Sequence, residues 1–210
     1  MTDIMRVLSA TSQSWISNDP GNRRWATPET LLSKDEIEAI ILEHIYDVIC
    51  ADDADNIDTL FDFLGDLVHR PEVAPAYGIA FVSGQGAEGA GVSLYLQLLR
   101  KALGDQDCYY GHGLPKNVEA TLKSKKLMIL YGICGGAVPP VKTILTSGSN
   151  CRLITTASFA GAQILKGNYR NIKVIEVSSK RVGDFLYFKR LAQAIEQGGA
   201  EIYRDYLMSK

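Results

Sequence analysis

The sequence predicts an α/β fold: a five-stranded, mainly parallel sheet in a three-layer α/β/α arrangement, preceded by an N-terminal helical segment. Two observations lead to this prediction. Short runs rich in β-branched and aromatic residues alternate with helical segments from residue 77 onward, as they do in βαβ units. The runs are apolar almost throughout, which is typical of strands buried on both faces. They read YGIAFVS, DCYYG, KLMILYG, CRLITTA and IKVIEVS.

Two helices are predicted ahead of the sheet. Ser33 and Glu36 match the S-x-x-E capping box, and apolar residues then recur at helical spacing over residues 34–50. A second apolar stripe runs through residues 51–70 and ends before Pro71. Both stripes indicate helices with one buried face.

The second of these segments is rich in aspartate. Its order differs from that of an EF-hand loop at Ile57, where a ligand should stand, so we interpret the acids as a solvated helix face and expect no metal. We divide the chain into an N-terminal arm with two helices, residues 1–75, and an α/β domain, residues 76–210.

The connections between strands are predicted to contain further helices. Because crossovers between parallel strands are right-handed, the loops that follow the strands should lie on one rim of the sheet, where such sheets bind ligands. Helices are expected over residues 89–103, from Pro139 and Pro140, over residues 160–166 and in the C-terminal segment, with a short polar crossover at residues 115–123.

Composition limits the classes of function. The chain has 210 residues, of which 46% are hydrophobic and 22% charged, so it can bury a substantial core. A formal net charge of -2 and a pI near 5.9 lack the basic excess of a nucleic-acid-binding protein. No apolar stretch approaches the roughly 20 residues that span a bilayer. Four scattered cysteines favour reduced thiols and a cytoplasmic location.

Three segments that follow predicted strands are candidates for binding phosphate: residues 84–89, 132–137 and 155–158. Glycine lets the backbone approach an anion, and a helix N-terminus offers free N–H groups. The first segment also fits the dinucleotide pattern G-x-G-x-x-G. The next strand ends in Gly111 and His112 instead of the acid that would bind the ribose, which disfavours NAD. A plain turn between strand and helix is the alternative.

The order of segments over residues 77–180 resembles the orotate and uracil phosphoribosyltransferases. The stretch GIAFVSGQGAEGAGVSLYLQLL lies where that family has its pyrophosphate loop, and a strand, a His-Gly loop, a strand with the phosphoribosyl-pyrophosphate (PRPP) motif, a helix and another strand follow. The resemblance implies a phosphorylated ligand, such as PRPP, a nucleotide or a sugar phosphate. PRPP would bring Mg²⁺ with it.

The resemblance also implies which residues contact that ligand. The first loop would face pyrophosphate, the loop from His112 to Lys116 would close over PRPP, and the third segment would cradle the 5′-phosphate. The ligand-binding residues implied in this way are Gly84, Gln85, Gly86, Ala87, His112, Lys116, Cys134, Gly135, Gly136 and Ala137.

The family's pair of ribose-binding acids is replaced here by Tyr131 and Gly132, so the enzyme class stays open, with phosphoribosyltransferase the class if the protein is active. Phosphosugar isomerase domains share the same succession of strands and loops and are an alternative. A third alternative is a non-catalytic oligomeric module, a homodimer for example, that uses the N-terminal arm with Trp15 and Trp25 as its interface.

Several side chains allow two interpretations. Cys134 could be a reactive thiol at a helix start, although a small loop residue is favoured because no base is near it in sequence. His112 could be an acid or a phosphate ligand. His44 is interpreted as a surface histidine or one whose hydrogen bonds are satisfied. Tyr110 and Tyr131 could form a wall for a base or belong to the core.

Overall fold

The structure is a computed structural model that describes residues 31–84, 89–133, 144–145, 147–168 and 171–210. One compact unit comprises Ser33–Lys210, and Met1–Leu32 lie outside it. The predicted boundary between residues 75 and 76 falls inside this unit. Trp15 and Trp25 of the predicted arm, and Pro139 and Pro140 at the start of a predicted helix, lie outside the described residues; residues 144–145 after them are helical.

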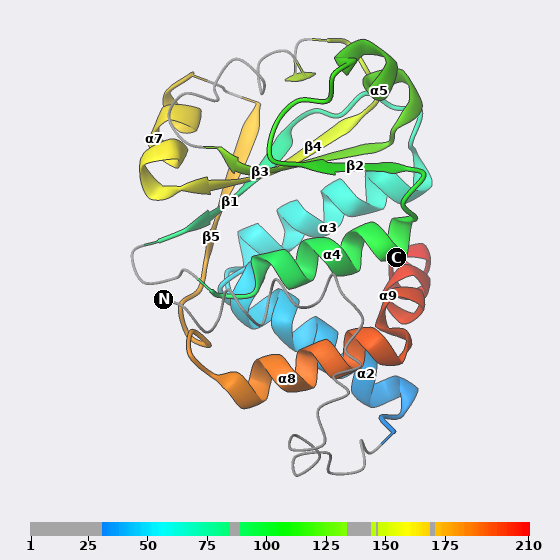
Figure 1. Cartoon of the computed structure of the whole chain (residues 1–210), viewed down its shortest axis with the longest axis vertical. Coiled ribbons are helices and arrows are strands. Elements are labelled where there is room, and N and C mark those ends of the chain that lie inside the picture. Colours follow the sequence, from blue (N-terminus) through cyan, green and yellow to red (C-terminus); the bar gives the residue numbers. More distant parts are fainter. Residues whose placement is uncertain (1–30, 85–88, 134–143, 146, 169–170) are drawn as a thin grey trace, which may run out of the picture. The chain divides into compact units, whose positions relative to one another are not determined.

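The predicted fold class is confirmed: five strands form one sheet in which every pair is parallel (Figure 1). The order of strands across the sheet is β2-β3-β4-β1-β5. All five apolar runs are strands: β1 (Gly78–Ser83), β2 (Cys108–Gly111), β3 (Leu127–Ile133), β4 (Arg152–Ser158) and β5 (Ile172–Val177).

Helices cover both faces of the sheet. On one face lie α5 (Val118–Ser124) and α7 (Phe159–Asn168). On the other lie α3 (Ala54–His69) and α4 (Val92–Leu103), as Figure 1 shows. A helical layer packs against α3 and α4 on the side away from the sheet. It consists of α2 (Lys34–Glu43), the π-helix η2 (His44–Ile49), α8 (Phe185–Ala194), the π-helix η3 (Ile195–Gly199) and α9 (Ala200–Met208).

The core follows from the alternation of side chains along buried strands. In β1, Ala80 and Val82 point into the apolar cluster under α5 and α7. Phe81 points to the other face, where its ring meets the Tyr95 ring of α4 with centroids 5.9 Å apart. Both faces of β1 are therefore dry, which is why its sequence has no polar alternation.

The order of strands fixes where a ligand could bind. The chain leaves β1 for α4 on one face, and it leaves the neighbouring strand β4 for α7 on the opposite face. The loops after β1 and β4 therefore diverge, and the carboxyl ends of these two strands form the switch point of the sheet. Ser83 and Ser158 are paired there.

Local chemistry explains the helical boundaries before the sheet. Ser33 and Glu36 form the predicted capping box. The helix predicted over residues 34–50 is real, but its last turns are the π-helix η2, which the apolar spacing did not reveal. Ala51 and Asp52 follow with positive φ angles of 57° and 58°. Asp53 then caps α3, with its side chain accepting from the Asn56 N–H, so part of the aspartate cluster has a capping role.

Two predicted segments differ from the structure. Residues 155–158 are not a loop: β4 continues to Ser158, and α7 begins directly at Phe159. The polar crossover at residues 115–123 contains α5, which Asn117 caps by accepting from the Ala120 N–H. Within the described ranges, no helix is both long and apolar enough to cross a membrane.

One buried arginine joins the sheet to α3. Arg152, at the start of β4, is 1% exposed, and its Nη2 donates to the carbonyls of Asp66 and Arg70 at the end of α3. Each of these carbonyls also accepts from a backbone N–H, that of Arg70 or Val73, and the negative end of the helix dipole favours a cation there. Burial lowers the pKa of Arg152. The side chain remains charged, because a guanidinium is not deprotonated in proteins.

Replacing Arg152 by alanine is expected to lower the free energy of unfolding by about 3 kcal/mol, because two hydrogen bonds from a charged donor are lost and the large buried side chain leaves a void. Urea denaturation measures the loss. Arg70→Ala is the matched control, since its side chain is 63% exposed and pairs with Asp66 on the surface. That control should cost less than about 1 kcal/mol. Equal losses would contradict a structural role specific to Arg152.

Candidate phosphate-binding site

The site begins where the glycine segment after β1 enters α4. Gly89 and Gly91 both have positive φ angles, 86° and 88°, which explains why α4 starts at Val92 and not at the predicted residue 89. Gly91 is the N-cap, and no side chain caps the helix. The first N–H groups of α4 therefore point toward the rim of the sheet without a side-chain acceptor.

A second pattern overlaps the one found in the sequence. Residues 86–93 read GAEGAGVS, which fits the P-loop pattern G-x-x-x-x-G-K-[ST] at every fixed position except the lysine, where Val92 stands. A strand precedes the pattern and a helix follows it, as the P-loop requires. The missing lysine is why the sequence alone did not suggest this pattern. Residues 85–88 lie outside the described residues.

The carboxyl end of β3 contributes Tyr131 and Gly132. The register between β3 and β4 shifts between Leu130 and Ile133, and Gly132 has a φ of 66°. The Gly132 N–H donates to Oγ1 of Thr156 over 2.8 Å. The register shift is typical of a β-bulge, an irregularity that is frequent beside active sites.

The Tyr131 ring fills the space beside the first turn of α4. Its ring centroid lies 4.8 Å from that of Tyr110 and 5.7 Å from that of His112. The hydroxyl is enclosed and makes no hydrogen bond with the described residues. Burial is the main cause that raises the pKa of Tyr131; Tyr110 raises it further, and Ser93 lowers it. The phenol is thus neutral and close to Ser93.

This arrangement determines which chemistry the rim can carry. In P-loop NTPases, the serine or threonine of the loop and an aspartate at the end of a strand hold Mg²⁺, and the lysine contacts the phosphates. Here Ser93 is present, Val92 replaces the lysine, and an uncharged phenol approaches Ser93. Among the described residues, no group of three or more acids, histidines and cysteines could hold a metal ion.

The residues implied by the sequence are only partly brought together. Gly84 follows β1, with no atom near the position of a Cβ. His112 and Lys116 follow β2 and are exposed. Two strands separate β2 from β1, so these loops begin about 14 Å apart. The ring of Tyr131 lies between them and contacts His112. The remaining implied residues, Gln85, Gly86, Ala87, Cys134, Gly135, Gly136 and Ala137, lie outside the described residues.

The cysteines that the structure describes are not reactive. Cys50, Cys108 and Cys151 are free and buried. Burial raises the pKa of Cys108 to about 11 and those of Cys50 and Cys151 to about 12. Thiolates are therefore scarce at neutral pH, and these side chains behave as small core residues.

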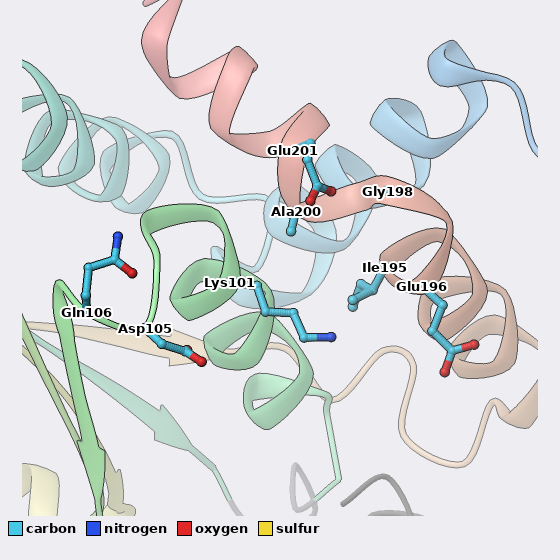
Figure 2. A pocket seen from close by; sticks show the side chains of 8 residues that line it. All are labelled: Lys101, Asp105, Gln106, Ile195, Glu196, Gly198, Ala200 and Glu201. Atoms are coloured by element: carbon cyan, nitrogen blue, oxygen red, sulfur yellow. The ribbon is translucent and has the colours of Figure 1, made fainter. Parts of the chain in front are cut away.

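One hollow lies away from the rim. Figure 2 shows it at the opposite end of α4, with a volume of about 830 Å³. Lys101 faces three acids there, and one of them, Asp105, is bound by Arg100. Among the described residues, no histidine, cysteine or hydroxyl side chain lines this hollow. Its lining residues are Lys101, Asp105, Gln106, Ile195, Glu196, Gly198, Ala200 and Glu201.

Comparisons with known proteins add one likeness of fold. No family model matches this chain, and no curated protein matches it. Among solved structures, it is similar to the A form apo structure of the NrS-1 C-terminal region, with a TM-score of 0.55 and 15% sequence identity. The alignment covers 78% of this chain and 44% of that one, so this chain spans less than half of the solved structure. At this identity, the likeness concerns the fold alone.

Proposed function

We propose that this protein is a P-loop-type module that binds a phosphorylated ligand through the backbone at the start of α4 and does not catalyse Mg²⁺-dependent phosphoryl transfer. The glycine segment and the uncapped helix support the binding of an anion. Val92 and Tyr131 support the absence of phosphoryl transfer. They stand where a P-loop NTPase has a lysine that contacts phosphate and an aspartate that holds Mg²⁺, and neither side chain is charged. Such a module acts through binding or assembly instead of turnover.

The observation that carries the proposal is the phenol beside Ser93. Mg²⁺ gives up its bound water reluctantly and is usually held in proteins by one or two carboxylates. Among the described residues, the position next to Ser93 has the phenol of Tyr131 and no carboxylate. A tyrosine phenol is already neutral at pH 7, and burial raises the pKa of Tyr131 further. PRPP, nucleotides and sugar phosphates, the ligands expected from the sequence, are all anions that the first N–H groups of α4 could bind. They therefore serve as probes of this site.

Restoring the missing groups is expected to create Mg²⁺-dependent nucleotide binding. The variant Val92→Lys/Tyr131→Asp places a cation and a carboxylate where a P-loop protein has them. Thermal melting and titration calorimetry with ATP, PRPP and pyrophosphate, each with Mg²⁺ or EDTA, measure the effect. The parent should shift equally in both conditions and release no phosphate, whereas the variant should bind ATP more tightly with Mg²⁺.

Two controls make the result specific. Tyr131→Phe removes the hydroxyl without adding a carboxylate, and Val92→Met changes the side chain without adding a charge; neither should gain Mg²⁺-dependent binding. A parent protein that hydrolyses ATP, or that binds it only with Mg²⁺, would contradict the loss of chemistry. If the parent binds none of the three probes, the proposal that it binds a phosphorylated ligand is wrong, and the protein is a purely structural module.

A further inference from the structure

One histidine of the helical layer contacts the start of α4. His44, the first residue of η2, is 1% exposed. Its Nε2 lies 3.4 Å from the carbonyl oxygen of Gly91, and its Nδ1 lies 2.9 Å from the hydroxyl of Tyr187 in α8. A single imidazole thus joins three segments that are far apart in the sequence. The histidine is satisfied, as one of the two interpretations held, and it is not on the surface.

The partners fix the protonation of the ring. A carbonyl oxygen can only accept, so Nε2 carries the hydrogen and donates to Gly91. In the neutral ring, Nδ1 then accepts from the Tyr187 hydroxyl. The guanidinium of Arg181 lies 4.6 Å from the centre of the Tyr187 ring and pairs with Glu43 of α2 over 2.7 Å. The orientation of His44 is therefore set by α8 and by the end of α2.

Rare backbone geometry surrounds this contact. His44 begins a π-helix, an element that is uncommon and often found at functional sites. Ala51 and Asp52, just beyond it, adopt positive φ angles that non-glycine residues seldom tolerate. The Phe188 ring also packs on Gly91: a Cβ built there would lie 2.6 Å from Phe188 Cε1 and 2.8 Å from His44 Cε1. The helical layer fits the backbone of Gly91 closely.

We propose that His44 is a latch through which the helical layer controls the N-terminus of α4. While Tyr187 holds the imidazole, the Gly91 peptide is fixed and the first N–H groups of α4 keep their direction. When α8 moves, the imidazole loses its orientation and the start of α4 is released. The latch consists of His44, Tyr187 and Gly91, and it does not depend on which ligand, if any, binds at the rim.

Tyr187→Phe tests the latch because it removes one hydroxyl and keeps the ring. Hydrogen exchange measured by mass spectrometry should show the amides in residues 89–99 exchanging about tenfold faster, the effect of losing one hydrogen bond. The amides of β5, residues 172–177, should be unchanged. The His44→Gln variant should show the same pattern, and if it fails to fold, the Tyr187 variant carries the test.

Tyr46→Phe is the matched control. Its hydroxyl lies 3.2 Å from that of Tyr206, so it joins η2 to α9 within the same helical layer without reaching Gly91. This control should leave residues 89–99 as protected as in the parent. Three results would overturn the latch: an equal effect of both substitutions on residues 89–99, a uniform acceleration in every peptide, or no effect of Tyr187→Phe there.

Discussion

Replacing Gly91 by alanine is expected to lower the free energy of unfolding by about 2–4 kcal/mol. A φ of 88° costs a residue with a Cβ about 1 kcal/mol. The new methyl group would also lie within 3 Å of carbon atoms in the buried His44 and the half-buried Phe188. Forcing such an overpacked contact adds about 1–3 kcal/mol. Urea denaturation monitored by circular dichroism measures the loss.

Gly89 provides the control for backbone strain alone. Its φ of 86° matches that of Gly91, and no atom lies within 4 Å of the position of its Cβ. Gly89→Ala should therefore cost about 1 kcal/mol. The difference between the two variants isolates the contact with the helical layer. Equal losses for Gly89→Ala and Gly91→Ala would show that the layer does not press on the start of α4.

Acidification is expected to destabilise the protein through His44 before the carboxylates titrate. Burial lowers the pKa of His44 from 6.5 to about 4. Between these values the unfolded chain binds a proton that the folded protein does not, so stability is complete above pH 6.5 and falls as the pH decreases toward 4. The loss should reach about 2 kcal/mol at pH 5 and about 3 kcal/mol at pH 4.

Urea denaturation at half-unit steps of pH measures this slope. His44→Gln should flatten the slope between pH 6.5 and 5, whatever its effect on stability at neutral pH. Asp47 titrates in a separate window: its hydrogen bond from Lys180 lowers its pKa, so its contribution is lost only as the pH falls below 3.8. A parent whose stability stays constant from pH 7 to 5 would contradict a buried neutral His44.

Element types were predictable from the sequence because they depend on local patterns. Continuous apolar runs identified all five strands, and the capping box at Ser33 located the first helix. The π-helix was not predictable, since Ile45, Val48 and Ile49 fit α-helical spacing as well as they fit the wider turn. Ser158 was placed in a loop because the apolar run before it ends at Ala157, whereas β4 includes Ser158, whose hydroxyl accepts from the Gly161 N–H at the start of α7.

The candidate site was predictable only in part, because it depends on contacts between distant segments. The glycines after β1 and the loss of acids at Tyr131 and Gly132 could be read from the chain. The order of strands could not, since local patterns do not specify which strands pair. The roles of His44 and Tyr187 were hidden for the same reason: 143 residues separate them, and neither belongs to a motif.

That separation has a consequence for biosynthesis. A ribosome adds about 5–20 residues per second, so His44 is made about 7–30 s before Tyr187. During that interval α3 and α4 can cover the growing sheet, but α9, which packs on both helices in the folded protein, has not been made. The nascent chain therefore exposes apolar surface on α3 and α4 until α9 emerges, and exposed apolar surface of this kind favours aggregation.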